Sequence, residues 1–310
     1  MSTNTEESLL NSAKLLVPSL SEPKHKGQDG RIGIVGGSLE YSGAPFFAGI
    51  SALRTGADLV HIFCCKEASI PIKSFSPELI VHPVLDDLNG LNLIEPWLER
   101  LHVILIGPGL GRDDQVFQTV SKLITKCKKL LKPLVIDADG LFLVGKNPEL
   151  IKNYPGLVLT PNAMEFSRLV KAIIHKDMTP SPIVEDKIIK ELAEAIGEQV
   201  IVVQKGSSDA IANGSKSTDP IHCSISGSGR RCGGQGDLLS GAISIFTCWS
   251  KGRTPNTNDP ISPAMLACYA ACRLVRECNA EAFKVKRRGM LASDMIEAIA
   301  PTFYRLFEKV

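Results

Sequence analysis

Four short runs of consecutive apolar residues constrain the fold of this chain more than any other feature. They read VILI, LVI, LVL and VIVV and lie within the segments 102–109, 133–140, 156–162 and 200–206. Runs that are apolar at every position are typical of parallel strands covered on both faces, because a strand with one wet face alternates. The runs are separated by amphipathic stretches. The sequence therefore predicts an α/β fold with three α/β/α layers, in which a mostly parallel, doubly wound sheet has helices on both faces.

The remaining elements follow from the same patterns. No linker rich in proline, serine or glycine divides the chain, so we expect one domain over residues 8–310, preceded by a flexible N-terminal arm over 1–7. Further strands are expected within 31–38 and 58–64 and as a pair that ends by residue 226; helices are expected at 44–55, 113–131, 163–173, 237–250, 260–278 and 290–308.

The composition argues against several classes of protein. The 310 residues include 35 Lys plus Arg against 33 Asp plus Glu, which gives no strong field to hold nucleic acid or an anionic membrane. No apolar run approaches the roughly 20 residues of a membrane span, and the first ten residues, MSTNTEESLL, have no leader pattern. Nine cysteines without CxxC spacing indicate a reducing compartment. We therefore expect a cytoplasmic protein.

Unusual residues follow five of the expected strands. They are the glycines at 36–37 and the stretches GPGLG at 107–111, DADG at 137–140, TPN at 160–162 and KG at 205–206. In open parallel sheets, ligands bind beyond the carboxyl ends of the strands, and the ends of all these strands meet at one edge. The sequence therefore predicts a single polar site at this edge.

The stretch GSGRRCGGQGDLLSGA at 227–242 gives this site its chemistry. Glycines allow backbone N–H groups to approach a ligand closely, and a following helix presents its positive end to an anion. Arg230 and Arg231 add charge, so the stretch is suited to a nucleotide's phosphates, and Asp237 would accept a proton from an attacking hydroxyl. The alternative is that Asp237 only caps the helix. The chain lacks the P-loop pattern GxxxxGKS/T, and GPGLG lacks GxGxxG spacing.

Other polar residues allow both a functional and a structural interpretation. Asn162 and Glu165 could face a phosphate or a magnesium shell, or form an ordinary capping box. Lys205 could meet phosphate or ribose, or end a strand in solvent. Asp137 and Asp139 could position substrate or metal, or end a strand and cap a helix. The six histidines show no metal or triad pattern.

Six motifs along the chain can be considered together. They are KHKGQDGRIGIVGGSLEYSGAPFFAGISALRTGADLV (24–60), IGPGLGR (106–112), DADGL (137–141), LTPNAMEFSRL (159–169), KGSSD (205–209) and GSGRRCGGQGDLLSG (227–241). In this combination they resemble the NAD(P)H-hydrate dehydratase family, which is ribokinase-like. The resemblance covers about residues 8 to 306 in the family's order, so the combination is far more specific than any single motif.

The resemblance implies a lyase that repairs the S-form of hydrated NADH and NADPH (NADHX and NADPHX). ATP, used with Mg²⁺, phosphorylates the 6-hydroxyl group, and loss of phosphate restores NADH or NADPH. The loop before Asp237 is similar to those of ATP-using eukaryotic members. The implied catalytic residue is Asp237; the implied substrate residues are Gly109, Asn162, Ala163, Met164, Glu165, Phe166, Ser167, Arg168 and Asp237; the implied ATP residues are Lys205, Gly206, Ser207, Ser208, Asp209, Gly227, Ser228, Gly229, Arg230, Arg231, Cys232, Gly233, Gly234, Gln235 and Gly236.

The resemblance also implies a partner enzyme, a separate NAD(P)HX epimerase in the same pathway, because this chain has no room for an epimerase domain. A homo-oligomer is compatible with the sequence. Two other functions stay open at this point. A ribokinase-like kinase of a thiazole or pyridoxal alcohol would share the loop and the fold, and a non-catalytic nucleotide-binding regulator would keep the loop alone.

Overall fold

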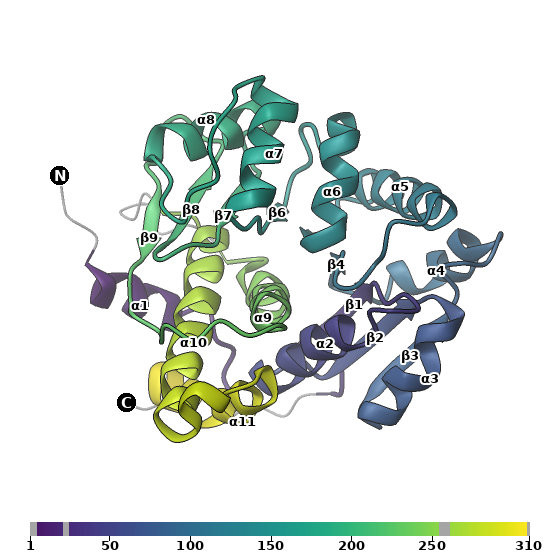
Figure 1. Cartoon of the computed structure of the whole chain (residues 1–310), viewed down its shortest axis with the longest axis horizontal. Coiled ribbons are helices and arrows are strands. Elements are labelled where there is room, and N and C mark those ends of the chain that lie inside the picture. The colour runs from purple at the N-terminus through teal and green to yellow at the C-terminus, as the bar shows by residue number, and fades with distance from the viewer. Residues whose placement is uncertain (1–4, 21–24, 254–260, 309–310) are drawn as a thin grey trace.

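The fold of the computed structural model, which describes residues 5–20, 25–253 and 261–308, is organised around one nine-stranded sheet (Figure 1). The strand order is β3-β2-β1-β4-β5-β6-β7-β8-β9; the strands from β3 to β7 are parallel, and β8 and β9 pair antiparallel. The strands are β1 (Arg31–Val35), β2 (Leu59–Cys64), β3 (Leu79–Pro83), β4 (Val103–Ile106), β5 (Leu134–Ile136), β6 (Leu157–Leu159), β7 (Ile201–Gln204), β8 (Asp209–Asn213) and β9 (Ile221–Cys223).

The order confirms the doubly wound topology. The chain starts in the sheet at β1, runs outward to β3, and then returns to β4 on the other side of β1. Such a reversal separates the two neighbouring loops and is where ligands commonly bind. Here the loops after β1 and β4 instead close on each other, because the Gly37 N–H donates to the Gly109 carbonyl (3.0 Å). The open site therefore lies farther along the sheet, beyond β5, β6 and β7.

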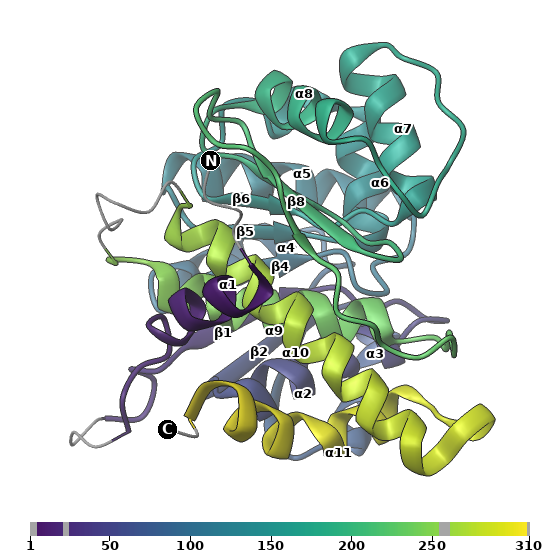
Figure 2. The ribbon, with the colours of Figure 1, turned by 90° about the vertical axis from the view of Figure 1, so that its left-hand side faces the viewer.

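Helices cover both faces of the sheet, as expected (Figures 1 and 2). One face carries α1, α2, α3, α9, α10 and α11, and the other carries α4 to α8. The helices are α1 (Glu6–Lys14), α2 (Gly43–Thr55), α3 (Lys66–Phe75), α4 (Gly90–Leu98), α5 (Asp114–Lys129), α6 (Ala138–Lys146), α7 (Ala163–Ile174), α8 (Asp186–Ile196), α9 (Gln235–Ser250), α10 (Pro263–Lys286) and α11 (Ala292–Phe303), with short turns η1 (Pro148–Leu150), η2 (Arg287–Gly289) and η3 (Tyr304–Glu308).

The side chains of the apolar strands belong to two separate hydrophobic cores, one on each face of the sheet. In β4, Val103 and Leu105 belong to the core under α9 and α10, whereas Ile104 and Ile106 belong to the core under α5 and α6. Successive side chains of a strand point to opposite faces, so a strand covered twice must be apolar throughout. This explains the unbroken run VILI, and it fixes α9 across the middle of the sheet.

The structure contains elements that the sequence patterns did not predict. In the segment between β2 and β4, α3 contains Pro71 and α4 contains Pro96. Proline inside a helix removes an N–H donor, so such helices are hard to recognise from sequence. The strand between them, β3, lies at the sheet edge and is partly exposed. The helices α1, α6 and α8 were also not expected, and α10 extends eight residues beyond its expected end at 278.

The N-terminal boundary differs from the expected flexible arm. Residues 1–4 lie outside the described residues, but Glu6 and Glu7 form the first turn of α1, where the Thr5 side chain accepts from the Ser8 N–H. Glu6 also accepts a hydrogen bond from the Ser224 N–H at 2.6 Å and contacts Arg273 at 3.5 Å. These contacts fix residue 6 to the body of the fold.

Two further predictions concern the cysteines and the membrane. All nine cysteines, from whose spacing we inferred a reducing compartment, are free thiols. Within residues 5–20, 25–253 and 261–308, no helix has the length and apolar character needed to cross a bilayer.

Candidate active site

The helix α9 begins at the centre of the predicted site. Its N-cap is Gly234, whose φ of +92° favours glycine; a Cβ there would lie 2.8 Å from the side chains of Phe47 and Ala292. The first helical hydrogen bond runs from the Leu238 N–H to the Gly234 carbonyl, so the amides before it have no acceptor within the helix. Amides at a helix N-terminus with no acceptor in the helix are able to bind an anion.

Asp237 is the third residue of α9 and does not cap it. The cap residue is Gly234, and the Asp237 carboxylate makes no hydrogen bond or ion pair with the residues that the structure describes. Burial, reinforced by the carboxylate of Asp137, raises the pKa of Asp237 to about 8, although Lys205 acts in the opposite direction. A carboxylate without a structural partner and with a pKa near neutrality is suited to accepting a proton.

Three charged side chains surround Asp237, and we call the four together the carboxylate–lysine cluster: Asp137, Glu165, Lys205 and Asp237. The Lys205 ammonium lies 2.7 Å from Asp137 Oδ1 and 3.9 Å from Glu165 Oε2. Burial alone would lower the pKa of Lys205, but Asp137 and Glu165 hold it above its ordinary value. Lys205 is therefore a charged lysine in a largely buried ion pair, and not the solvated end of a strand.

The Asn162–Glu165 pair forms the capping box that was one of its two interpretations. The Asn162 side chain accepts from the Met164 and Glu165 N–H groups, and Glu165 Oε2 accepts from the Asn162 N–H at 2.8 Å. Glu165 Oε1 has no partner among the described residues, and burial raises the pKa of this carboxyl. Asn162 is thus committed to the helix, whereas Glu165 keeps one oxygen for another ligand.

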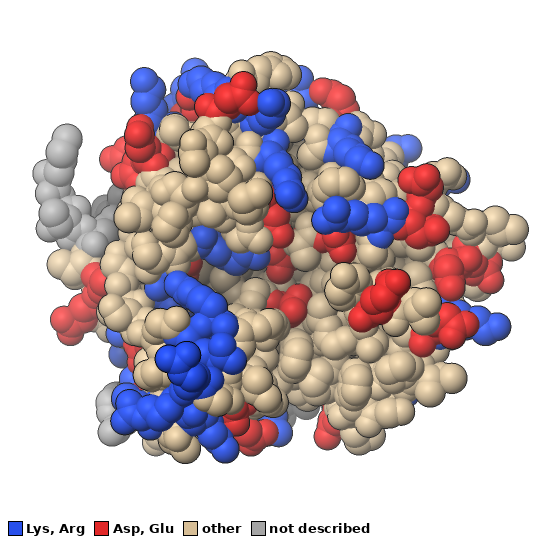
Figure 3. Space-filling view, in the orientation of Figure 1, with Lys and Arg blue, Asp and Glu red and all other residues tan. Residues whose placement is uncertain are grey.

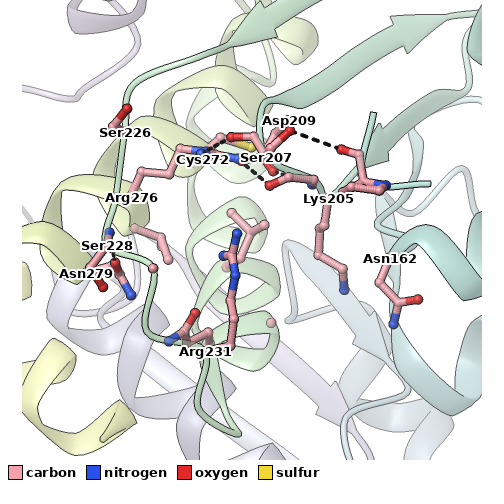
Figure 4. A pocket seen from close by; sticks show the side chains of 18 of the residues that line it. Asn162, Lys205, Ser207, Asp209, Ser226, Ser228, Arg231, Cys272, Arg276 and Asn279 are labelled. Atoms are coloured by element: carbon pink, nitrogen blue, oxygen red, sulfur yellow. Dashed lines mark hydrogen bonds and ion pairs between the residues drawn. The ribbon is translucent and has the colours of Figure 1, made fainter. Parts of the chain in front are cut away.

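A cavity of about 770 Å³ opens beside the cluster, beyond β6 and β7. In Figure 4, Lys205 and Arg231 reach into the same space from different sides. Figure 3 shows this face hollowed near its centre, with red carboxylates inside and blue side chains around it. The expected ATP residues that line the cavity are Lys205, Gly206, Ser207, Asp209, Gly227, Ser228, Gly229, Arg231, Cys232, Gln235 and Gly236.

The two adjacent arginines of the loop have different surroundings. Arg231 lines the cavity, whereas Arg230 donates through Nε to the Met290 carbonyl at 3.3 Å and does not line it. Ser208 also lies outside, because its hydroxyl contacts the Cys223 carbonyl and the Ser224 hydroxyl. Of the two adjacent arginines, only Arg231 therefore adds its charge to this cavity, which Lys205 and Arg276 also line.

Arg276, on α10, lines the cavity although it lies in none of the sequence motifs. Its guanidinium contacts Asp209 Oδ2 at 2.6 Å and donates to the carbonyls of Gly206, Ser207 and Ile225 at 2.9, 2.9 and 3.2 Å. Asp209 in turn accepts from the Gly206 N–H at 3.0 Å. Asp209, an expected ATP residue, is therefore an ion-pair partner that fixes the loop. On the same helix, Asn279 accepts from the Ser228 N–H.

Replacing Arg276 by lysine keeps the charge but removes the planar fork that joins four groups. We expect the KM for ATP to rise about tenfold or more, with a smaller change in kcat, because the lost charge-assisted hydrogen bonds are each worth roughly 1.5–3 kcal/mol. Steady-state kinetics with ATP as the varied substrate measures this. Lys284→Gln, which removes an exposed pair with Glu281 on the same helix, is the control. Equal ATP KM values in both variants would exclude the role.

The expected substrate residues do not form one group in the structure: some are buried, and others line one of two cavities. Gly109 is buried, and a Cβ there would lie 2.3 Å from the carbonyl oxygen of Tyr41. Phe166 is 1% exposed and its side chain belongs to the core, so only its backbone is accessible to a ligand. Asn162 and Ala163 line the large cavity, and Glu165 and Arg168 line a second one. Met164 is exposed, and Ser167 donates to its carbonyl.

Comparison with known proteins identifies the family. The family model described as NAD(P)H-hydrate dehydratase matches residues 32–301. The chain belongs to the NAD(P)H-hydrate dehydratase family. It is 53% identical over 300 residues to the ATP-dependent (S)-NAD(P)H-hydrate dehydratase of Aedes aegypti, with 97% of this chain and 85% of that protein covered. The family predicted from the six motifs is therefore confirmed.

Solved structures confirm the ribokinase-like fold of this dehydratase family member. A ribokinase-like superfamily protein from Enterococcus faecalis superposes with a TM-score of 0.78 at 21% identity, covering 97% of this chain and 95% of the other. An ADP/ATP-dependent NAD(P)H-hydrate dehydratase from Bacillus subtilis, co-crystallized with ATP and Mg²⁺, gives 0.69 at 24% identity with 98% of both chains covered. At these identities the likeness concerns the fold.

The donor groups of this family member fit a magnesium ion that is shared with a nucleotide. Within residues 5–20, 25–253 and 261–308, no group of three His, Cys, Asp or Glu side chains forms a protein-only metal site. Mg²⁺ typically takes one or two carboxylates and completes its shell with phosphates and water. Glu165, with its unpartnered Oε1 beside Lys205, is the residue that would hold it.

Proposed function

We propose that this chain uses ATP to dehydrate the S-form of hydrated NADH and NADPH, and so returns them to NADH and NADPH. The observation that carries the proposal is Asp237, an unpartnered carboxylate at the start of α9, where the helix amides and a cationic cavity can receive phosphates. Membership of the NAD(P)H-hydrate dehydratase family, with a relative named as ATP-dependent, supports the choice of substrate and nucleotide.

The chemistry follows from this placement. Asp237 accepts the proton of the substrate's 6-hydroxyl group, and the hydroxyl oxygen forms a bond to the terminal phosphorus of ATP while the bond to ADP breaks. Lys205 and Arg231 stabilise the phosphate charge. The carbon–oxygen bond then breaks, phosphate leaves with the electron pair, and loss of a proton from the neighbouring ring carbon restores the double bond. Phosphorylation is needed because hydroxide is a poor leaving group.

The proposal includes the partners that the family resemblance implied. Mg²⁺ arrives with ATP and neutralises phosphate charge when it is bound. A separate epimerase would supply the S-form from the other epimer. We also propose a cytoplasmic location, supported by nine free thiols.

A purified-protein assay tests the function. With ATP, Mg²⁺ and hydrated NADH, the absorbance of reduced nicotinamide should reappear, with one ADP and one phosphate released for each NADH formed. A vitamin kinase would instead convert a thiazole or pyridoxal alcohol into a stable phosphoester. Phosphoester formation without any recovery of NADH would refute the dehydratase function.

The rate should depend on pH through Asp237. Asp237 acts as a base only in its carboxylate form. The fraction of Asp237 in this form rises with pH and becomes nearly complete above its pKa of about 8, the value that burial and the charge of Asp137 produce. We expect kcat/KM for hydrated NADH to increase up to about tenfold per pH unit below that value and to level off above it. A pH–rate profile between about pH 6 and pH 9 measures this. A flat profile would contradict Asp237 as the base.

A further inference from the structure

A second cavity, of about 300 Å³, lies on the other side of the carboxylate–lysine cluster. It is enclosed by residues of α6, by Glu165 and Arg168 of α7, and by Arg112 from the loop after β4. Its volume lies at the lower end of the range for small-molecule sites. It therefore suits one part of a large ligand rather than a whole dinucleotide.

Cations dominate the functional groups of this cavity. Arg168 and Lys146 are exposed, and neither makes a hydrogen bond or ion pair with the part of the chain that the structure describes. The carboxylate of Asp139 is engaged by Arg112 Nε at 3.0 Å and by the Gly111 N–H at 3.2 Å. The remaining carboxylate, Glu165, contacts Lys205 at 3.9 Å through Oε2, and its Oε1 has no partner among the described residues. The cations Arg112, Lys146 and Arg168 outnumber the two carboxylates that line the cavity. The cavity therefore has positive charge available for an anion.

The cations converge on one aromatic ring. The guanidinium carbon of Arg112 lies 4.1 Å from the ring centroid of Phe142, and Lys146 Nζ lies 4.7 Å from the same centroid. Contacts with a ring face hold the two cations without neutralising them. Figure 3 shows several blue side chains over α6 and α7 on this face of the molecule.

A strained turn joins the second cavity to the first. Ala138 has a φ of +46°, a left-handed conformation that is uncommon for a residue with a Cβ. On its two sides, Asp137 pairs with Lys205 of the large cavity and Asp139 pairs with Arg112 of the small one. Glu165 lines the small cavity while it contacts Lys205. The two cavities thus meet at the cluster, where Lys205 lines the large cavity and Glu165 lines the small one.

We propose that the second cavity binds a phosphate group of the hydrated dinucleotide through Arg112, Lys146 and Arg168. The inference rests on the proposed function and specifies how its substrate is held: the reactive ring lies at Asp237, and a distant phosphate is held by these cations. Arginine forks match phosphate oxygens, and lysine adds a point charge. Two groups of the substrate have this chemistry, the pyrophosphate of both dinucleotides and the ribose phosphate found only in the NADPH form.

Equilibrium binding of NADPH and NADH, the products of the proposed reaction, tests the site, with the fluorescence of reduced nicotinamide as the signal. The variants are Arg168→Gln and Lys146→Gln, with Lys122→Gln on α5 as a control that removes another exposed lysine. We expect the Kd to rise about tenfold or more in Arg168→Gln, the equivalent of losing one charge-assisted hydrogen bond. Because these side chains are exposed, the variants should keep the Tm of the parent.

Comparison of NADPH with NADH binding shows which phosphate of the dinucleotide the second cavity holds. A rise in Kd for NADPH alone supports the ribose phosphate, and an equal rise for both supports the pyrophosphate. Unchanged Kd values for both dinucleotides, or a raised Kd for ATP instead, would overturn the proposal. Turnover of hydrated NADH by the parent is measured in parallel. If the parent is inactive, the proposed function fails, while the binding measurement still decides what the cavity holds.

Discussion

Replacing Asp237 by asparagine should lower kcat by about 10²- to 10⁴-fold, the usual contribution of a general base, and leave ATP binding nearly unchanged. Asparagine has a similar shape but does not accept the hydroxyl proton. Asp237 makes no ion pair or hydrogen bond with the described residues, so no structural contact is lost. Single-turnover kinetics and calorimetry with ATP measure the two effects. Turnover at the parent's rate would refute the mechanism.

The same variant should be more stable than the parent. Burial first, and the charge of Asp137 second, raise the pKa of Asp237 from 3.8 to about 8, so the folded state binds the proton more tightly than the unfolded state. This carboxyl therefore makes the fold less stable as pH rises across that interval. Asparagine does not ionise. The gain in Tm of Asp237→Asn over the parent should grow with pH and become constant above about pH 8, whereas a Tm loss would show that Asp237 has a structural role.

Among the variants described here, Lys205→Met should show the largest decrease in the free energy of unfolding. Asp137 is 2% exposed and Lys205 is 18% exposed, so removal of the ammonium leaves a buried carboxylate without its partner. Breaking a buried pair in this way typically costs about 3–5 kcal/mol. Because Lys205 also lowers the pKa of Asp237, the rise of activity should shift to higher pH in this variant. Denaturant unfolding and a pH–rate profile measure the two effects.

Two further variants distinguish the cost of leaving the buried Asp137 carboxylate unpaired from the general effect of replacing a lysine by methionine. Lys176→Met removes an exposed pair with Glu191, so about 0–1 kcal/mol is expected there. Adding Asp137→Asn to Lys205→Met should restore part of the stability, since the amide needs no cation. If Lys205→Met is no less stable than Lys176→Met, then Lys205 does not stabilise the fold by pairing with the buried carboxylate of Asp137.

The site was predictable where its residues follow one another in sequence. The glycine-rich loop, Asp237 and Lys205 all lie in short motifs, and the structure brings them together at the carboxyl ends of the strands. Arg276 and Asn279 could not be found in this way, because they lie on α10, far along the chain, and act by holding loop backbone. A polar residue on an otherwise buried helix was the only available signal.

The fold was predictable where burial is complete. Strands β4 to β7 are apolar throughout because two layers of helices cover them, and this pattern survives in the sequence. Edge strand β3 and helices α3 and α4 are less covered, and the prolines of these helices obscure their periodicity. In contrast, the buried residues of α8 have helical spacing, so this helix was predictable from the positions of Ile189, Leu192, Ala193 and Ile196.

The fate of the hydroxyl oxygen tests most directly whether the 6-hydroxyl group of the substrate attacks ATP, which is the step that Asp237 is proposed to assist. Hydrated NADH that carries a heavy-oxygen label in its 6-hydroxyl group is incubated with the protein, ATP and Mg²⁺, and the released phosphate is examined by mass spectrometry. Because the hydroxyl oxygen becomes the bridging oxygen of the phosphorylated intermediate, the label should appear in inorganic phosphate, one atom for each NADH formed. Label recovered in water, with unlabelled phosphate, would show that ATP is hydrolysed without phosphorylating the substrate and would contradict the account.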